Sequence, residues 1–165
     1  MPRVTVGLVG CGFVAELHMY AYKRVYGIDA EVTAVAARGD HVLDFARKHN
    51  IRKTYRDFRD LLDDGEIDVI DICTPPALHA PMVVDAVQAG KHVICEKPFA
   101  GYFGRADDKT PIGKHVPKSL MYERVLEENG QDLCRDQIER PAVYVCRRLD
   151  LRARGDKNGR DIEQH

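Results

Sequence analysis

The stretch VTVGLVGCGFVAELH, Val4 to His18, decides the fold of this 165-residue chain. Its first part, Val4 to Val9, is apolar with no polar alternation beyond Thr5, which is typical of a strand buried on both faces of a parallel sheet. Gly10-Cys11-Gly12 follows, and from Val14 the apolar residues recur at helical spacing at Leu17, Ala21 and Val25, which predicts that these face inward. The stretch predicts a strand, a tight glycine turn and a helix that ends near Gly27.

The glycine turn fits the pattern G-x-G-x-x-G/A with Gly10, Gly12 and Ala15. The first glycine permits the tight turn, the second lets a pyrophosphate approach the backbone, and the small third residue lets helix and strand pack closely. The helix then presents free N–H groups and the positive end of its dipole. Because a predicted strand precedes the motif and a helix follows it, we interpret it as a dinucleotide site. A plain structural turn is the alternative.

The next hundred residues alternate between apolar runs and helical patterns. Strands are predicted at 32–37, 68–74 and 92–95. Helices are predicted from Asp40 to Asn50, with Leu43 and Ala46 facing inward, at 58–62, and at 80–89 before Gly90. This alternation predicts an α/β fold, a doubly wound parallel (Rossmann) sheet with helices on both faces.

Four unusual segments follow the predicted strands. They are Gly10-Cys11-Gly12, Ala37-Arg38, Thr74-Pro75-Pro76 and Glu96-Lys97-Pro98. Because ligands bind at the carboxyl ends of the strands in such sheets, we expect these segments to gather along one edge and form the site.

The residues after the second strand bear on the choice of dinucleotide. NAD-selective sites place an acidic residue there for the ribose 2′-OH, whereas this chain has Ala37 and then Arg38. A guanidinium holds a 2′-phosphate with two charge-assisted hydrogen bonds. The sequence therefore favours NADP, with NAD as the alternative if Arg38 is a solvated surface residue.

Four further side chains at the predicted edge are candidates for proton chemistry. Lys97 directly follows a strand, where an ammonium group can bond a substrate oxygen, and Glu96 can set its orientation. Spacing alone favours the interpretation of these two residues as an ordinary charged pair at a strand end. His18 and His79 also fall at this edge, but each is more often a core or surface histidine than a catalytic one.

The composition excludes several classes of function. Apolar residues make up 44% and charged residues 31%, and the net charge of −1 gives no general attraction to nucleic acid or to an acidic membrane. No apolar run approaches the roughly 20 residues that span a bilayer. The five cysteines form no C-x-x-C pair, so we expect a cytoplasmic protein without a metal site.

The chain changes character after Pro98. Residues 99–118 combine glycines, prolines and charges, which predicts a long loop, and 119–128 predict a helix. Residues 129–165 are polar, rich in arginine and without clear period, with a strand only at 142–146. We therefore expect a Rossmann domain at 1–128 and a loop-rich, irregular tail at 129–165.

Two segments of the sequence, and the order of strands and helices between them, carry a resemblance to a known family. The segments GLVGCGFVAELH, DVIDICTPPALHAPMVVDAVQAGKHVICEKP and the strand–helix order between them resemble the Gfo/Idh/MocA oxidoreductases, from Val4 to about Glu128. The glycine turn, the Thr-Pro…His loop and Glu-Lys-Pro occur in the family's order and at its intervals.

The resemblance implies an NAD(P)-binding domain and hydride transfer with a sugar, polyol or related carbonyl substrate. It places Gly10, Gly12, Phe13 and Val14 at the pyrophosphate, Ala37 and Arg38 at the adenosine ribose, and Thr74, Pro75 and His79 beside the nicotinamide. Glu96 and Lys97 match the family's motif, with Lys97 at the substrate, so that Lys97, Glu96 and His79 are the expected catalytic residues. Full-length relatives are expected to be homo-oligomers.

We expect one departure from the family, the absence of the second domain, which in relatives supplies most of the substrate pocket. We hypothesise a frameshift near Asn129, because Tyr144 to Arg160 can be encoded so that another frame reads like the family's continuation. The competing explanation is a natural short protein with its own tail. The expected function is oxidoreductase by descent, with cofactor binding but negligible turnover. The alternatives are a dinucleotide-binding module without turnover and a fragment that completes its pocket with another chain.

Overall fold

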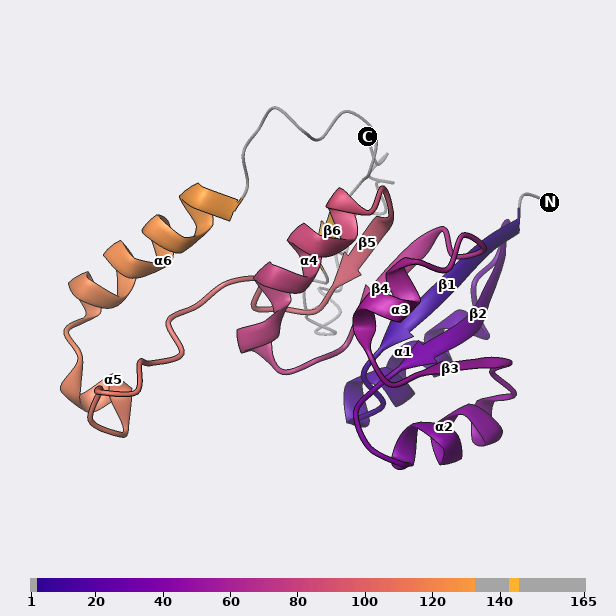
Figure 1. Cartoon of the computed structure of the whole chain (residues 1–165), viewed down its shortest axis with the longest axis horizontal. Helices are drawn as coiled ribbons and strands as arrows, with labels where there is room; N and C mark the ends of the chain where they lie inside the picture. The colour runs from indigo at the N-terminus through magenta and orange to yellow at the C-terminus, as the bar shows by residue number, and fades with distance from the viewer. Residues whose placement is uncertain (1–2, 133–142, 146–165) are drawn as a thin grey trace, which may run out of the picture.

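The computed structural model describes residues 3–132 and 143–145, and it confirms the doubly wound α/β sheet (Figure 1). The sheet has six strands in the order β3-β2-β1-β4-β5-β6, and every neighbouring pair is parallel. The strands are β1 (Arg3–Val9), β2 (Asp29–Ala36), β3 (Lys53–Tyr55), β4 (Val69–Ile72), β5 (His92–Cys95) and β6 (Val143–Val145).

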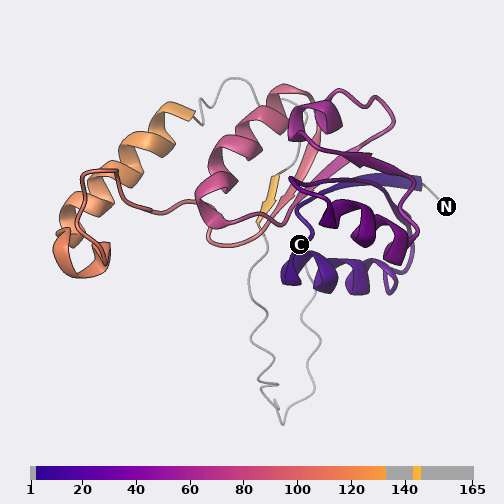
Figure 2. The same ribbon diagram turned by 60° about the horizontal axis from the view of Figure 1, so that its bottom comes forward.

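Helices cover both faces of the sheet (Figure 2). On one face lie α1 (Phe13–Tyr22) and α2 (His41–His49), and on the other lie α3 (Phe58–Leu62) and α4 (His79–Gln88), the last preceded by a 3₁₀ turn at Pro76–Leu78. Beyond α4 and away from the sheet lie α5 (Ile112–His115) and α6 (Lys118–Asp132). Within the described ranges, no helix has the length and apolar character that crossing a membrane requires.

The core consists of two apolar layers, one on each face of the sheet. Ile70 and Ile72 of β4 pack in the layer under α3 and α4. Because side chains alternate along a strand, Asp71 lies on the opposite face, between Val69 and Cys73, which pack in the layer under α1 and α2. The alternation of β4 therefore directs one carboxylate toward α1.

The buried faces of α1 and α2 differ from the predicted ones. Helix α1 ends at Tyr22 rather than near Gly27, and its Leu17 is 52% exposed, while Ala15 and Met19 are buried. The reason is that the stripe that packs on the sheet also carries His18 and Tyr22, which bond to Asp71.

In α2 the prediction is right for Ala46 and wrong for Leu43, which is exposed, because Val42 and Phe45 fill the core. Asp40 is the N-cap residue as predicted, but its side chain makes no cap bond and instead pairs with Arg56.

The helix and the strand predicted after Pro98 are present, but the loop predicted at 99–118 contains the short helix α5. The helix expected at 119–128 is α6, which continues to Asp132, and the strand expected at 142–146 is β6, which pairs with β5. The remainder of 129–165, predicted to be an irregular tail, lies outside the described residues.

Candidate functional site

The four segments singled out from the sequence meet at one edge of the sheet, as predicted. Backbone hydrogen bonds join them: Gly10 N–H donates to Ala36 O at 2.8 Å, and Cys73 N–H donates to Val9 O at 2.8 Å. Glu96 N–H donates to Ile72 O at 3.1 Å. The carboxyl ends of β2, β1, β4 and β5 thus form one continuous rim.

The two glycines of the turn have different environments. Gly10 has φ +98°, and a Cβ atom built on it would lie 2.6 Å from the carbonyl oxygen of Cys73. The chain therefore requires glycine there, because β4 passes too close for any side chain. At Gly12, by contrast, an added Cβ atom would meet no atom within 4 Å. The space over Gly12 is open.

The N-terminus of α1 faces this open space. Gly12 is the N-cap residue and no side chain caps the helix, so the N–H groups of its first turn are available to a ligand. Phe13 is 78% exposed beside them, and Val14 is half-buried. An uncapped ten-residue helix behind an unobstructed glycine fits a pyrophosphate, which needs close backbone approach and N–H donors.

The other end of the rim carries Ala37 and Arg38. Ala37 N–H donates to Tyr55 O at 3.2 Å, so the ends of β2 and β3 lie together. Arg38 is exposed at this corner. Arg56, which follows β3, pairs with Asp40 at 2.5 Å between Nη2 and Oδ1.

The loop after β4 is fastened to the loop after β5 through His79. This side chain is buried, with Nδ1 2.8 Å from Pro98 O and Nε2 2.8 Å from Thr74 O. A neutral imidazole donates to only one of the two carbonyls at a time. In this arrangement His79 is next to Thr74 and Pro75, as the resemblance implies, but its ring nitrogens face backbone rather than solvent.

Glu96 and Lys97 follow β5 at the opposite end of the rim from Arg38, with β1 and β4 between. Glu96 is half-buried and its Oε2 accepts the backbone N–H of Lys97 at 3.2 Å. Lys97 is exposed. The contact between the two residues is thus through the backbone of Lys97 and not through its ammonium group.

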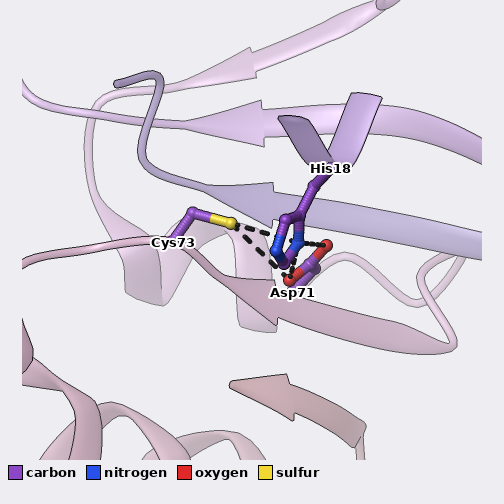
Figure 3. Close-up of side chains that lie close together, drawn as sticks. All are labelled: His18, Asp71 and Cys73. Carbon is purple, nitrogen blue, oxygen red and sulfur yellow. Dashed lines mark hydrogen bonds and ion pairs between the residues drawn. The ribbon is translucent and has the colours of Figure 1, made fainter. Parts of the chain in front are cut away.

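His18, Asp71 and Cys73 form a largely buried network (Figure 3), which Glu96 joins through His18. His18 Nδ1 donates to Asp71 Oδ2 at 2.8 Å, and His18 Nε2 lies 3.1 Å from Glu96 Oε1. Tyr22 Oη donates to the same Asp71 oxygen at 2.8 Å, and Cys73 Sγ lies 3.4 Å from His18 Nδ1. The hydrogen bond to Asp71 raises the pKa of His18 above its ordinary value, Glu96 adds to this, and burial opposes it.

Sequence reasoning missed Asp71 and Tyr22. Asp71 is fully buried, flanked by Ile70 and Ile72 in a strand that is otherwise apolar. A charged residue inside such a strand needs a partner, because an unpaired buried charge is costly. That rule is the signal that the sequence contained, and His18 is the partner that it could not name.

His18, Asp71 and Cys73 each offer one atom that could ligate a metal ion, and these atoms lie within 4.8 Å of one another. Within the described part of the chain, no other group of His, Cys, Asp and Glu side chains meets this spacing. Hydrogen bonds among the three already pair these atoms. We therefore assign them to a hydrogen-bonded network.

Comparisons with known proteins agree with this geometry. The sequence profile of an oxidoreductase family with an NAD-binding Rossmann fold, Gfo/Idh/MocA, matches residues 4–117. Levoglucosan dehydrogenase of Pseudarthrobacter phenanthrenivorans is 35% identical over 156 residues, which is 90% of this chain and 37% of that protein. An uncharacterised protein of Saccharomyces cerevisiae is 32% identical over 88% of this chain and 43% of its own length.

Solved structures show the same relationship. A levoglucosan dehydrogenase in complex with NADH and L-sorbose superposes with a TM-score of 0.57 at 34% identity, over 60% of this chain and 28% of that one. An NAD-binding oxidoreductase from Klebsiella pneumoniae gives a TM-score of 0.62 at 29% identity, over 87% of this chain and 34% of its own. The chain thus spans well under half the length of these relatives, and it belongs to the Gfo/Idh/MocA oxidoreductase family through its NAD-binding Rossmann domain.

Proposed function

We propose that this chain is the cofactor-binding part of an NAD(P)-dependent oxidoreductase that acts on a sugar, polyol or related carbonyl compound. The observation that supports this best is the glycine turn. Glycine is required at position 10 by the close approach of the Cys73 carbonyl, whereas Gly12 leaves open space before the uncapped α1. The sugar substrate is proposed by analogy with levoglucosan dehydrogenase, of which the chain spans 37%.

In this proposal each segment of the rim holds one part of the dinucleotide. The N–H groups around Gly12, Phe13 and Val14 bind the pyrophosphate, and Ala37 and Arg38 lie at the adenosine ribose. Thr74 and Pro75 lie beside the nicotinamide. The bound cofactor supplies hydride transfer.

Lys97 is proposed to bond the substrate oxygen and move its proton, with Glu96 beside it. Lys97 is exposed at the end of β5, where an incoming substrate reaches it. His79, predicted as a catalytic residue, is proposed to act at least by holding the Thr74 and Pro98 carbonyls together, since both ring nitrogens face them.

We further propose a preference for NADP over NAD. Arg38 is exposed at the end of β2, and the nearby Asp40 already pairs with Arg56. A guanidinium beside a neutralised carboxylate attracts a 2′-phosphate.

The second candidate is a dinucleotide-binding module without turnover. The chain spans 37% of levoglucosan dehydrogenase and 43% of the yeast relative, so we propose a cofactor domain at 1–128 that binds nucleotide with negligible turnover by itself. Robust dehydrogenase activity of the purified 165-residue chain would contradict this proposal.

The test is titration of the chain with NADPH and with NADH, followed by nucleotide fluorescence. Gly12→Ala should abolish binding of both nucleotides while leaving the circular dichroism spectrum unchanged, because the added methyl meets only the space where the pyrophosphate lies. Arg38→Ala should weaken NADPH alone, by roughly 1.5–3 kcal/mol for a lost charge-assisted bond.

Arg59→Ala, on the exposed surface of α3, is the matched control and should leave both affinities unchanged. Unchanged binding in Gly12→Ala would refute the dinucleotide site. Equal losses for both nucleotides in Arg38→Ala would refute the NADP preference alone.

A further inference from the structure

We propose that His18 is a positioning residue, which holds the Glu96 carboxylate in place and through it the backbone of Lys97. The inference rests on the proposed function for the meaning of Lys97, but the contacts themselves do not depend on it. They run from the middle of α1 to the carboxyl end of β5, across β4.

The first step is the position of His18 between two carboxylates. Nδ1 faces Asp71, whose side chain is fully buried, and Nε2 faces Glu96, whose side chain is 19% exposed. The imidazole itself is 16% exposed. A ring that donates from both nitrogens cannot rotate without losing a bond, so α1 and β4 together fix the direction in which Nε2 points.

The second step is that the two carboxylate oxygens of Glu96 have different partners. Oε1 lies 3.1 Å from His18 Nε2, and Oε2 accepts the Lys97 N–H at 3.2 Å. Both oxygens of one carboxylate are therefore engaged at once. The side chain thus links α1 to Lys97, the second residue after β5, so a change at His18 should alter the environment of the Lys97 amide.

The third step is charge. An imidazolium bonds both carboxylates, whereas a neutral ring turns a lone pair toward one of them. The groups that contact His18 are Asp71 from β4, Cys73 directly after β4 and Glu96 after β5, and Tyr22 from α1 bonds the same Asp71 carboxylate. Of these, Asp71 contributes most to raising the pKa of His18, and Glu96 adds to it.

A purely structural role is the alternative to positioning. In that case Asp71 would anchor His18 inside the protein, and Glu96 would bond it incidentally without any effect on Lys97. The two cases differ in one measurable respect, which is whether the Lys97 amide senses the protonation of His18.

The experiment is nuclear magnetic resonance on the isotopically labelled 165-residue chain without nucleotide. The His18 ring and the Lys97 backbone amide are followed as pH is varied. We expect the Lys97 amide shift to show a titration step at the midpoint of the His18 ring, and we expect that step to disappear in His18→Gln. The Arg59 amide, whose partner is the Asp57 side chain, should show no such step.

Glu96→Gln is the second variant and keeps the test decisive if His18→Gln does not fold. It should lower the midpoint of the His18 ring and remove the shared step from Lys97. Glu123→Gln neutralises an exposed carboxylate on α6, far from α1 in both views, and should change neither signal (Figures 1 and 2).

A Lys97 amide with no step at the His18 midpoint, or a His18 midpoint that Glu96→Gln leaves unchanged, would overturn the inference. The nucleotide titrations test the proposed function separately. A chain that shows the shared step yet binds no dinucleotide would refute the proposed function and leave the positioning role standing.

Discussion

The two ends of the rim are built in opposite ways. At one end three side chains are largely buried, and His18 bonds both Asp71 and Glu96. At the other end Arg38 is exposed, and the neighbouring pair of Arg56 and Asp40 is also largely exposed, with side chains 58% and 90% accessible. The glycine turn after β1 lies between these ends.

This difference separates a buried part of the rim, which contributes to stability, from an exposed part, where we propose that the ligand is recognised. Buried charges must satisfy one another, so the network end is part of the core and is expensive to alter. Exposed charges cost the fold little, so the Arg38 end is free to serve a ligand. Four predictions test this contrast, beginning with the largest effect.

Asp71→Ala should destabilise the protein by about 3–5 kcal/mol. It removes the carboxylate that pairs with the largely buried His18 and that accepts the hydrogen bond of the Tyr22 hydroxyl. Urea unfolding followed by circular dichroism measures the change. Asp63→Ala, at an exposed position after α3, should stay within about 0.5 kcal/mol of wild type. Similar losses in the two variants would remove the distinction between buried and exposed carboxylates.

The two glycines at the middle of the rim are expected to differ: substitution of Gly10 should affect the stability of the fold, and substitution of Gly12 should not. Gly10→Ala should cost roughly 2–4 kcal/mol, because its φ of +98° disfavours a side chain and the methyl would contact the Cys73 carbonyl. Gly12→Ala should cost less than about 0.5 kcal/mol. Urea midpoints of the two variants provide the comparison, and a larger loss in Gly12→Ala would reverse it.

The stability of the network end should depend on pH. Because the pKa of folded His18 is raised, its contribution is complete below the unfolded pKa of about 6.5 and is lost as pH rises through the folded pKa. Each unit of elevation corresponds to about 1.4 kcal/mol. Urea unfolding at several pH values should show the advantage of wild type over His18→Gln shrinking as pH rises, and a constant advantage would contradict this.

Arg56→Ala should have the smallest effect, less than about 0.5 kcal/mol, because its ion pair with Asp40 is solvated. Thermal melting of both proteins in low and high salt measures it. Salt should reduce even this small difference, since screening weakens exposed pairs. A loss comparable to that of Asp71→Ala would show that the Arg38 end is part of the core as well.

The sequence predicted the fold well where a local pattern of residue types specifies a strand or a turn. β1, β4 and β5 are short apolar runs that read directly as buried strands, and glycine marked the turn after β1. β3 was not predicted, because KTY is only three residues long and lies at the sheet edge, where burial leaves no apolar signature. The faces of α1 and α2 were misassigned at Leu17 and Leu43, since spacing alone permits more than one apolar stripe.

In the candidate site, too, the features that follow from local patterns were predictable and the contacts between distant residues were not. The four segments at the rim follow from the rule that parallel strands end at one edge. The pairing of His18 with Asp71 joins residues 53 positions apart, and no local pattern specifies it. Which histidine meets which carboxylate is decided by the register of β4 against α1, which only the folded chain sets.

The imidazole of His79 has a consequence for how the protein would handle two ligands. The ring contacts Pro98 O through Nδ1 and Thr74 O through Nε2, so that it connects the loops after β4 and β5. Displacement of one loop by a nucleotide would carry the other with it. Binding at either loop would therefore be sensed at the other.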